Sequence, residues 1–262
     1  MKTTTPSILI ILSLVCVGLL PGAHAVVPPA DGCYPGFTTA EGCNALHFLG
    51  AGAGNTGIGW YSLFSVGDAN FNTAVGAGTL VLNTADSNTA VGAAALLLNT
   101  TGSNNTAVGT DALVYNNTGV GNTATGAFAL FNNTEGNFNT ANGEFALFFN
   151  TTGERNTAIG DSALNSNTEG SRNTAIGNPA LLLNTTGHDN TAVGADALSA
   201  NISGIGNIAL GNNALTANTE GDFNTAIGVG ALVSNLTGAQ NTAVGSNAGG
   251  IVTGTGNTAL GN

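Results

Sequence analysis

Apolar and polar positions recur with a period of 17 residues along most of this chain. The phrase Asn-Thr-Ala-Val/Ile-Gly, or a close variant, occurs thirteen times, with only two intervals shortened to 16 residues. A short fixed period indicates a solenoid, because a 17-residue unit cannot bury its own apolar face and must stack on its neighbours. We therefore predict an all-β parallel β-solenoid in which each repeat forms one coil. The copies begin at Asn55, Asn72, Asn88, Asn105, Asn122, Asn139, Asn156, Asn173, Asn190, Asn207, Asn224, Asn241 and Asn257.

Numbered from its Asn, each repeat reads Asn-Thr-Ala-Val/Ile-Gly-x-x-Ala-Leu-x-x-Asn-Thr-x-Gly-x-x. Positions 2 to 5 predict a short strand, because Thr and Val favour extended backbone and Gly ends it. Position 4 is aliphatic in most repeats, and position 9 is Leu in every complete repeat, from Leu63 to Leu232. We expect these two columns to form a shared core.

The alanine at position 3 then points outward, because neighbouring residues of a strand face opposite sides. A column of outward alanines makes a flat apolar stripe, which suits close contact with the same stripe on another copy of the chain. The alternative is that the alanines fill a cramped second layer of the interior. The predicted contact residues are Ala74, Ala90, Ala107, Ala124, Ala158, Ala175, Ala192 and Ala226.

The second half of the repeat predicts either another short extended segment or a single helical turn. Gly at position 15, for example Gly153, fits a corner with positive φ. Asn at position 12, for example Asn150, suits a turn, and columns of Asn can also form amide ladders along a solenoid. The pattern reaches upstream to residues 38–46, which predict a degenerate first coil.

The first 25 residues are typical of a secretory signal, with Lys2, an apolar stretch over residues 8–20 and a small-x-small site at residues 23–25. The alternative is a retained anchor, although the stretch is shorter than the roughly 20 residues of a spanning helix. We expect a signal peptide at 1–25, an N-terminal cap segment at 26–37 and the repeat domain at 38–262. The mature chain is then secreted, extracellular or at the cell surface, without a transmembrane span.

Two cysteines, Cys33 and Cys43, remain once the signal is removed. In an oxidising compartment they predict one disulfide, which would hold the cap segment over the open end of the solenoid.

Charged residues are scarce, with 14 Asp and Glu against 3 Lys and Arg. This balance excludes nucleic-acid binding, which needs basic residues to neutralise phosphates. The three histidines do not recur with the repeat, so we predict no catalytic residues, no cofactor and no metal site, and therefore no enzyme.

The phrase Thr-Ala-Val/Ile-Gly, repeated with small residues and polar turns, resembles the head repeats of YadA-like trimeric autotransporter adhesins. The longer Asn-Thr-Ala-x-Gly-x-x-Ala-Leu-x-x-Asn-Thr-x-Gly unit is similar to repeats of bacterial surface and tail-fibre-like proteins. The resemblance covers residues 38–262 and implies a left-handed β-roll, a homotrimer packed along the small-residue face, and adhesion to a host or surface protein or glycan. The coil is longer here than in those head repeats, and no stalk or membrane anchor follows residue 257.

The sequence therefore predicts a secreted, non-catalytic β-solenoid with a structural or adhesive role. The last partial repeat ends at Asn262 with an open edge, for which there are three explanations: the sequence is a fragment, a partner docks there, or copies stack end to end into a fibre. The alternative function is an ice-binding solenoid, because columns of Thr at positions 2 and 13 could order water. That alternative requires the Thr at position 2 to face solvent.

Overall fold

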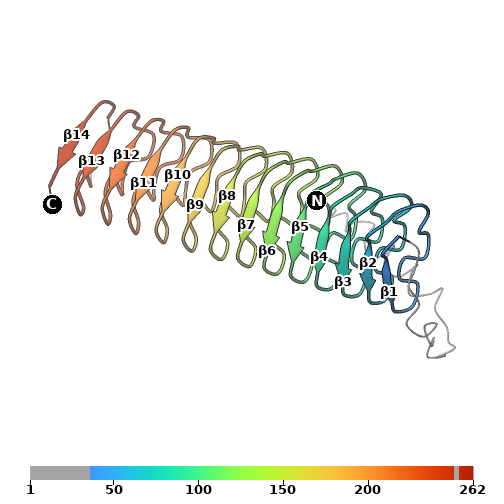
Figure 1. Ribbon diagram of the computed structural model, residues 1–262. Coiled ribbons are helices and arrows are strands. Elements are labelled where there is room, and N and C mark those ends of the chain that lie inside the picture. Colours follow the sequence, from blue (N-terminus) through green and yellow to red (C-terminus); the bar gives the residue numbers. More distant parts are fainter. Residues whose placement is uncertain (1–35, 251–253, 262) are drawn as a thin grey trace, which may run out of the picture. The chain divides into compact units, whose positions relative to one another are not determined.

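The computed structural model describes residues 36–250 and 254–261, which form one continuous stack of coils (Figure 1). Each coil contributes one three-residue strand, and the strands form a single 14-stranded sheet in chain order. The predicted signal peptide, most of the predicted cap segment and Cys33 lie outside the described residues. The strands are β1 Thr39–Glu41, β2 Thr56–Ile58, β3 Thr73–Val75, β4 Thr89–Val91, β5 Thr106–Val108, β6 Thr123–Thr125, β7 Thr140–Asn142, β8 Thr157–Ile159, β9 Thr174–Ile176, β10 Thr191–Val193, β11 Ile208–Leu210, β12 Thr225–Ile227, β13 Thr242–Val244 and β14 Thr258–Leu260.

Every pair of neighbouring strands is parallel, and equivalent positions of successive coils lie opposite each other. Ala158 of β8, for example, lies between Ala141 of β7 and Ala175 of β9. The degenerate first coil joins the sheet in the same register, with Thr39 opposite Thr56. These pairings confirm the parallel β-solenoid and its 17-residue coil.

The predicted orientation of the strand residues was wrong. The alanines at position 3 are fully buried inside a single chain, whereas Ile159 at position 4 keeps 39% of its surface exposed. Position 1 sets the alternation, because its Asn is buried and period 2 then turns position 3 inward and positions 2 and 4 outward. A contact between copies through the alanine stripe therefore loses its basis at Ala74, Ala90, Ala107, Ala124, Ala158, Ala175, Ala192 and Ala226.

Leucine at position 9 supplies the large side chains of the core, as predicted. Leu147 and its equivalents are buried, together with the small alanine at position 8. The segment around it is neither a strand nor a helical turn. Residues at positions 7 and 9 instead have positive φ, 54° at Phe145 and 53° at Leu147, which is a strained region for bulky side chains. The Leu147 amide still donates to the Ala163 carbonyl at 3.0 Å, so the turn loses no backbone pairing.

Two ladders of buried asparagine run along the interior. At position 12, the Asn150 Nδ2 donates to the Asn133 Oδ1 of the preceding coil at 2.7 Å and to the Gly153 carbonyl at 3.0 Å. At position 1, the Asn156 backbone amide donates to the Asn139 Oδ1 at 3.0 Å. A thin interior can hold these polar groups because each amide is hydrogen-bonded. The amide ladder considered from sequence is therefore present at both positions.

Two glycines in most coils are required by close approach, although Ala69 takes position 15 in the coil that begins at Asn55. Gly160 at position 5 turns the corner with φ +133°, and a Cβ there would lie 2.6 Å from the Gly177 carbonyl oxygen. Gly153 at position 15 does not have the predicted positive φ. A Cβ at Gly153 would instead overlap the Asn150 Oδ1 and the Gly170 carbonyl oxygen, so the ladder excludes any side chain there.

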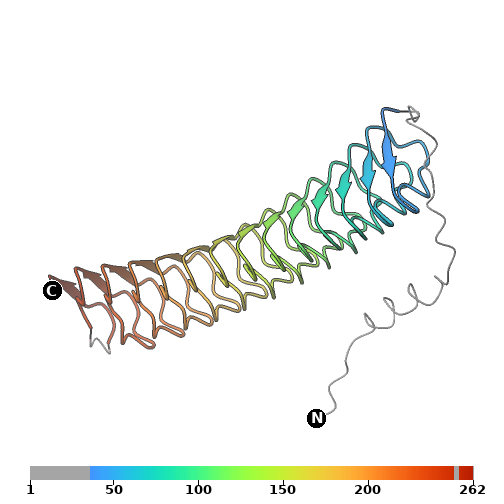
Figure 2. The same cartoon turned by 90° about the horizontal axis from the view of Figure 1, so that it is seen from below.

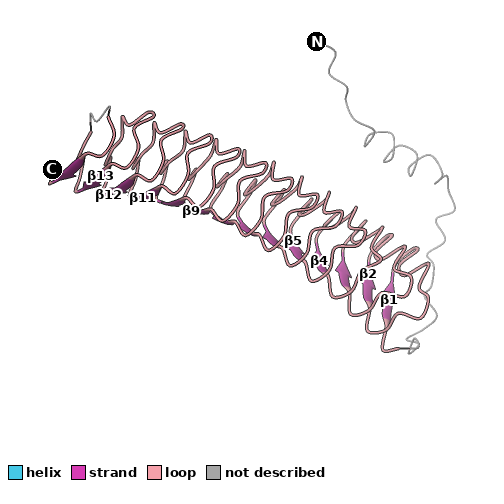
Figure 3. Cartoon of the chain, turned by 90° about the horizontal axis from the view of Figure 1, so that it is seen from above, coloured by secondary structure: helices cyan, strands magenta, loops and turns pink. Residues whose placement is uncertain are grey.

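The sheet twists along the stack. Strands near β1 present their broad side in Figure 2, whereas strands near β14 are seen almost edge-on, and Figure 3 shows the same progression from the opposite side. This is the usual twist between neighbouring strands. The outer side of the sheet is consequently flat only over a few neighbouring coils.

Candidate binding face

The outer side of the sheet carries two columns of side chains, which we call the sheet face. Position 2 is Thr in every strand except β11, where it is Ile208, and position 4 is mostly Val or Ile. These residues are exposed or half-buried, whereas position 3 between them is buried in most strands. The Thr at position 2 therefore faces solvent, the reverse of the expectation that position 4 points inward, and this is the orientation that the ice-binding alternative requires.

The sheet face is almost free of charge. Glu41 of β1 is its only charged residue among the described strands, and every other acidic or basic residue described occupies positions 6, 7, 14, 15, 16 or 17. The formal net charge of the chain is −11. The sheet face is thus the side on which a neutral partner meets the fewest charged groups, because the carboxylates lie on the adjoining turns.

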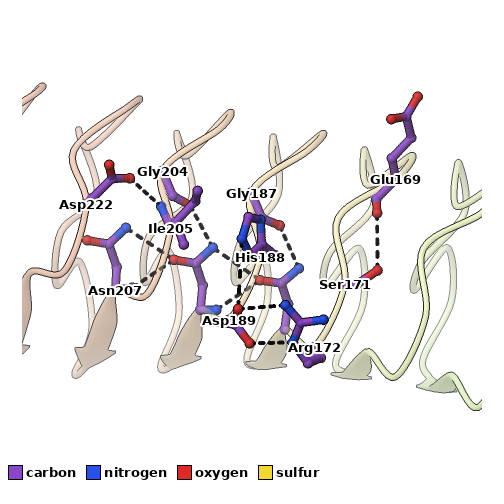
Figure 4. Close-up of polar contacts among 12 residues, drawn as sticks. Glu169, Ser171, Arg172, Gly187, His188, Asp189, Gly204, Ile205, Asn207 and Asp222 are labelled. Atoms are coloured by element: carbon purple, nitrogen blue, oxygen red, sulfur yellow. Dashed lines mark hydrogen bonds and ion pairs between the residues drawn. The ribbon is translucent and has the colours of Figure 1, made fainter.

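Charged groups gather on the adjoining turn instead (Figure 4). Arg172 and Asp189, both at position 17, form a two-pronged ion pair with distances of 2.6 Å from Nε to Oδ1 and 2.8 Å from Nη2 to Oδ2. The hydrogen bond from Arg172 holds the pKa of the Asp189 carboxyl below its usual value. His188 lies 3.9 Å from the same carboxylate. Because the pair is exposed, it organises the surface and adds little stability.

Position 17 also carries aromatic residues, at the point where the turn enters the strand. Phe71, Phe138 and Phe223 are 68%, 57% and 60% exposed, and all three have positive φ. Position 17 carries different residues in other coils, so the three phenylalanines fall into one column only once the coils are stacked.

A second aromatic group lies at positions 7, 10 and 11. Phe128 stacks on Phe145 and Phe131 stacks on Phe148, with ring centroids 5.2 Å apart in both pairs. These rings are half-buried, so they partly cover the coil wall and partly face solvent. Burial raises the pKa of the nearby Asp111 carboxyl.

The predicted disulfide, metal sites and membrane span can be compared with the described residues. Cys43 is exposed in the first coil, and since its predicted partner Cys33 lies outside the described residues, the disulfide stays a prediction. Across the described coils, no group of three or more His, Cys, Asp or Glu side chains could hold a metal ion. No helix in residues 36–250 or 254–261 is long and apolar enough to cross a membrane.

No known protein family matches the chain, and no curated protein or solved structure is significantly similar to it. The class of the protein is defined by its fold, which is a parallel β-solenoid with 17-residue coils.

Proposed function

We propose that this chain is a secreted, non-catalytic β-solenoid that acts as an adhesive or structural element outside the cell. The observation that carries the proposal is the sheet face, an exposed and nearly uncharged surface repeated on fourteen successive strands. A surface of this kind provides many weak identical contacts to one extended partner, and such contacts add up through multivalency. The signal peptide predicted over residues 1–25 and the resemblance to YadA-like head repeats support the same role.

Location and adhesion test the proposal together. The chain should be found in the medium or on intact source cells, where an added protease should digest it. Cells from which the gene has been deleted should adhere less to the surfaces that wild-type cells colonise. A chain that stays inside the cell, or an unchanged adhesion after deletion, would refute the proposal.

Two negative charges added to the sheet face test directly whether this surface is the adhesive one. Thr157→Asp combined with Thr174→Asp should reduce the adhesion of beads coated with the mature chain, because each carboxylate must lose water on contact. Thr152→Asp combined with Thr186→Asp adds the same charge at exposed position 14 and should leave adhesion unchanged. Equal effects of the two double variants would show that the sheet face is not the adhesive surface.

Ice binding is a second candidate, supported by one specific observation, the outward Thr column. Successive strands place these hydroxyls about 4.8 Å apart. The twist in Figures 2 and 3 limits the match to a planar crystal to a few coils at a time. Thermal hysteresis of the mature chain, abolished in the Thr157→Asp and Thr174→Asp variant but not in its control, would establish ice binding in place of adhesion.

A further inference from the structure

The phenylalanines at position 17 are exposed and fill no part of the core. The core of each coil is filled by the leucine at position 9, and other coils place Ser87, Asn104 or Gln240 where Phe71 and its equivalents stand. Exposing a large apolar ring to water costs free energy, and such rings on a protein surface are typical of contact sites. These three rings are therefore candidates for contact with a binding partner.

Each of the three rings is held against the wall of the solenoid by a glycine. In all three cases the preceding coil has Gly at position 17, where the ring occupies the space that a side chain would need. A Cβ at Gly54 would lie 2.7 Å from the Phe71 ring, one at Gly121 2.8 Å from the Phe138 ring, and one at Gly206 2.7 Å from the Phe223 ring. The rings are thus positioned before any ligand arrives, which lowers the entropy cost of binding.

The rings border the Thr column of the sheet face. Phe138 and the outward Thr140 are separated only by the buried Asn139, so their Cα atoms are at most about 7 Å apart. One ligand can therefore contact an aromatic ring and a row of hydroxyl groups together. With four coils between Phe71 and Phe138 and five between Phe138 and Phe223, the rings lie roughly 19 Å and 24 Å apart along the stack.

We propose that Phe71, Phe138 and Phe223, with the Thr column beside them, bind a neutral polysaccharide chain that runs along the solenoid. Sugar rings present apolar C–H faces that pack on aromatic rings, and hydroxyl groups that exchange hydrogen bonds with Thr. The ring separations require a polymer rather than a short oligosaccharide. A flexible polymer can follow the twist of the sheet, and the net charge of −11 disfavours an anionic one. This inference rests on the proposed adhesive function and names its ligand class.

The test is co-sedimentation of the full mature chain with insoluble cellulose and chitin, with an anionic polysaccharide as comparison. The triple variant Phe71→Ala, Phe138→Ala and Phe223→Ala should bind about tenfold more weakly or worse, as for truncated aromatic anchors. A control with Phe48→Ala and Phe149→Ala removes two exposed rings at position 11 and should bind as the wild type does. Circular dichroism should show that both variants keep the solenoid.

The Gly121→Ser variant tests the position of the Phe138 ring while all three phenylalanines remain in the chain. Ser87, with φ +61°, shows that serine is accepted at the residue that precedes the buried Asn, and the added Cβ at residue 121 displaces the Phe138 ring. Binding should weaken measurably while the fold is retained. Three outcomes would overturn the inference and leave the adhesive role standing. They are unchanged binding in the triple variant, stronger binding to the anionic polymer, and no binding to any neutral polysaccharide by a chain whose coated beads still adhere. Polysaccharide binding without any effect of gene deletion on adhesion would refute the adhesive role alone.

Discussion

Removing one rung of the position-12 asparagine ladder should destabilise the solenoid locally and strongly. Asn150→Ala deletes two donated hydrogen bonds, to the Asn133 Oδ1 and the Gly153 carbonyl, and one accepted from the Asn167 Nδ2 at 2.7 Å. Gly153 keeps its bond from Asn139, and Asn167 keeps its bond to Gly170. The Asn133 Oδ1 is therefore the only group left buried without a partner.

The magnitude follows from that count. A buried acceptor without a partner costs about 1–3 kcal/mol, and each of the two other lost bonds about 0.5–1.5 kcal/mol. We expect the free energy of unfolding to fall by about 2–6 kcal/mol. Thr152→Ala in the same coil changes an exposed side chain without a hydrogen bond and should stay within about 0.5 kcal/mol of the wild type.

Urea denaturation followed by circular dichroism measures the overall change, and amide hydrogen exchange locates it. Because each coil contacts mainly its neighbours, protection should fall in the coils next to residue 150 and persist at distant ones. A change below about 0.5 kcal/mol, with unaltered protection around Leu147 and Gly153, would refute the view that the ladder holds the interior together.

Four further substitutions test other parts of the structure. Ala158→Val should lower the free energy of unfolding by about 1–3 kcal/mol by overfilling the interior, whereas Ile159→Thr should lower it by less than about 1 kcal/mol. If urea denaturation gave the reverse order, the alanine would point outward after all. Gly153→Ala should cost about 2–4 kcal/mol by displacing the ladder, and a loss under about 1 kcal/mol would contradict the close approach. Arg172→Ala should raise the pKa of Asp189 toward its ordinary value in an NMR titration. Since the folded pKa is lowered, the stability from this pair is present above the unfolded pKa and is lost as the pH falls through the folded pKa, so this variant should lose that pH dependence.

The period of the repeat was sufficient to predict the architecture. Seventeen residues are too few to bury an apolar face alone, so stacking into coils follows from the spacing of Asn and Leu. The leucine column at position 9 was identified correctly for the same reason, because a large apolar side chain present in every complete repeat must share a core. The amide ladder could be anticipated too, since asparagines at equivalent positions of stacked coils lie within hydrogen-bonding reach of one another.

The direction of the strand residues could not be read from the same pattern. Alternation fixes that Ala158 and Ile159 face opposite sides, but it does not say which side is inside, and the larger apolar residue was assumed to be buried. Tertiary structure decided otherwise, because Asn156 is buried and the alternation then buries Ala158 and exposes Ile159. The same reversal exposed the Thr column and made the sheet face a candidate binding surface.

The sequence by itself thus determined the repeat, the parallel stack and the leucine core, all of which depend on spacing along the chain. Only the folded coil decided which face meets solvent and which glycines lie beneath Phe71, Phe138 and Phe223. Those features depend on contacts between residues 17 positions apart, which form only when one coil rests on the next.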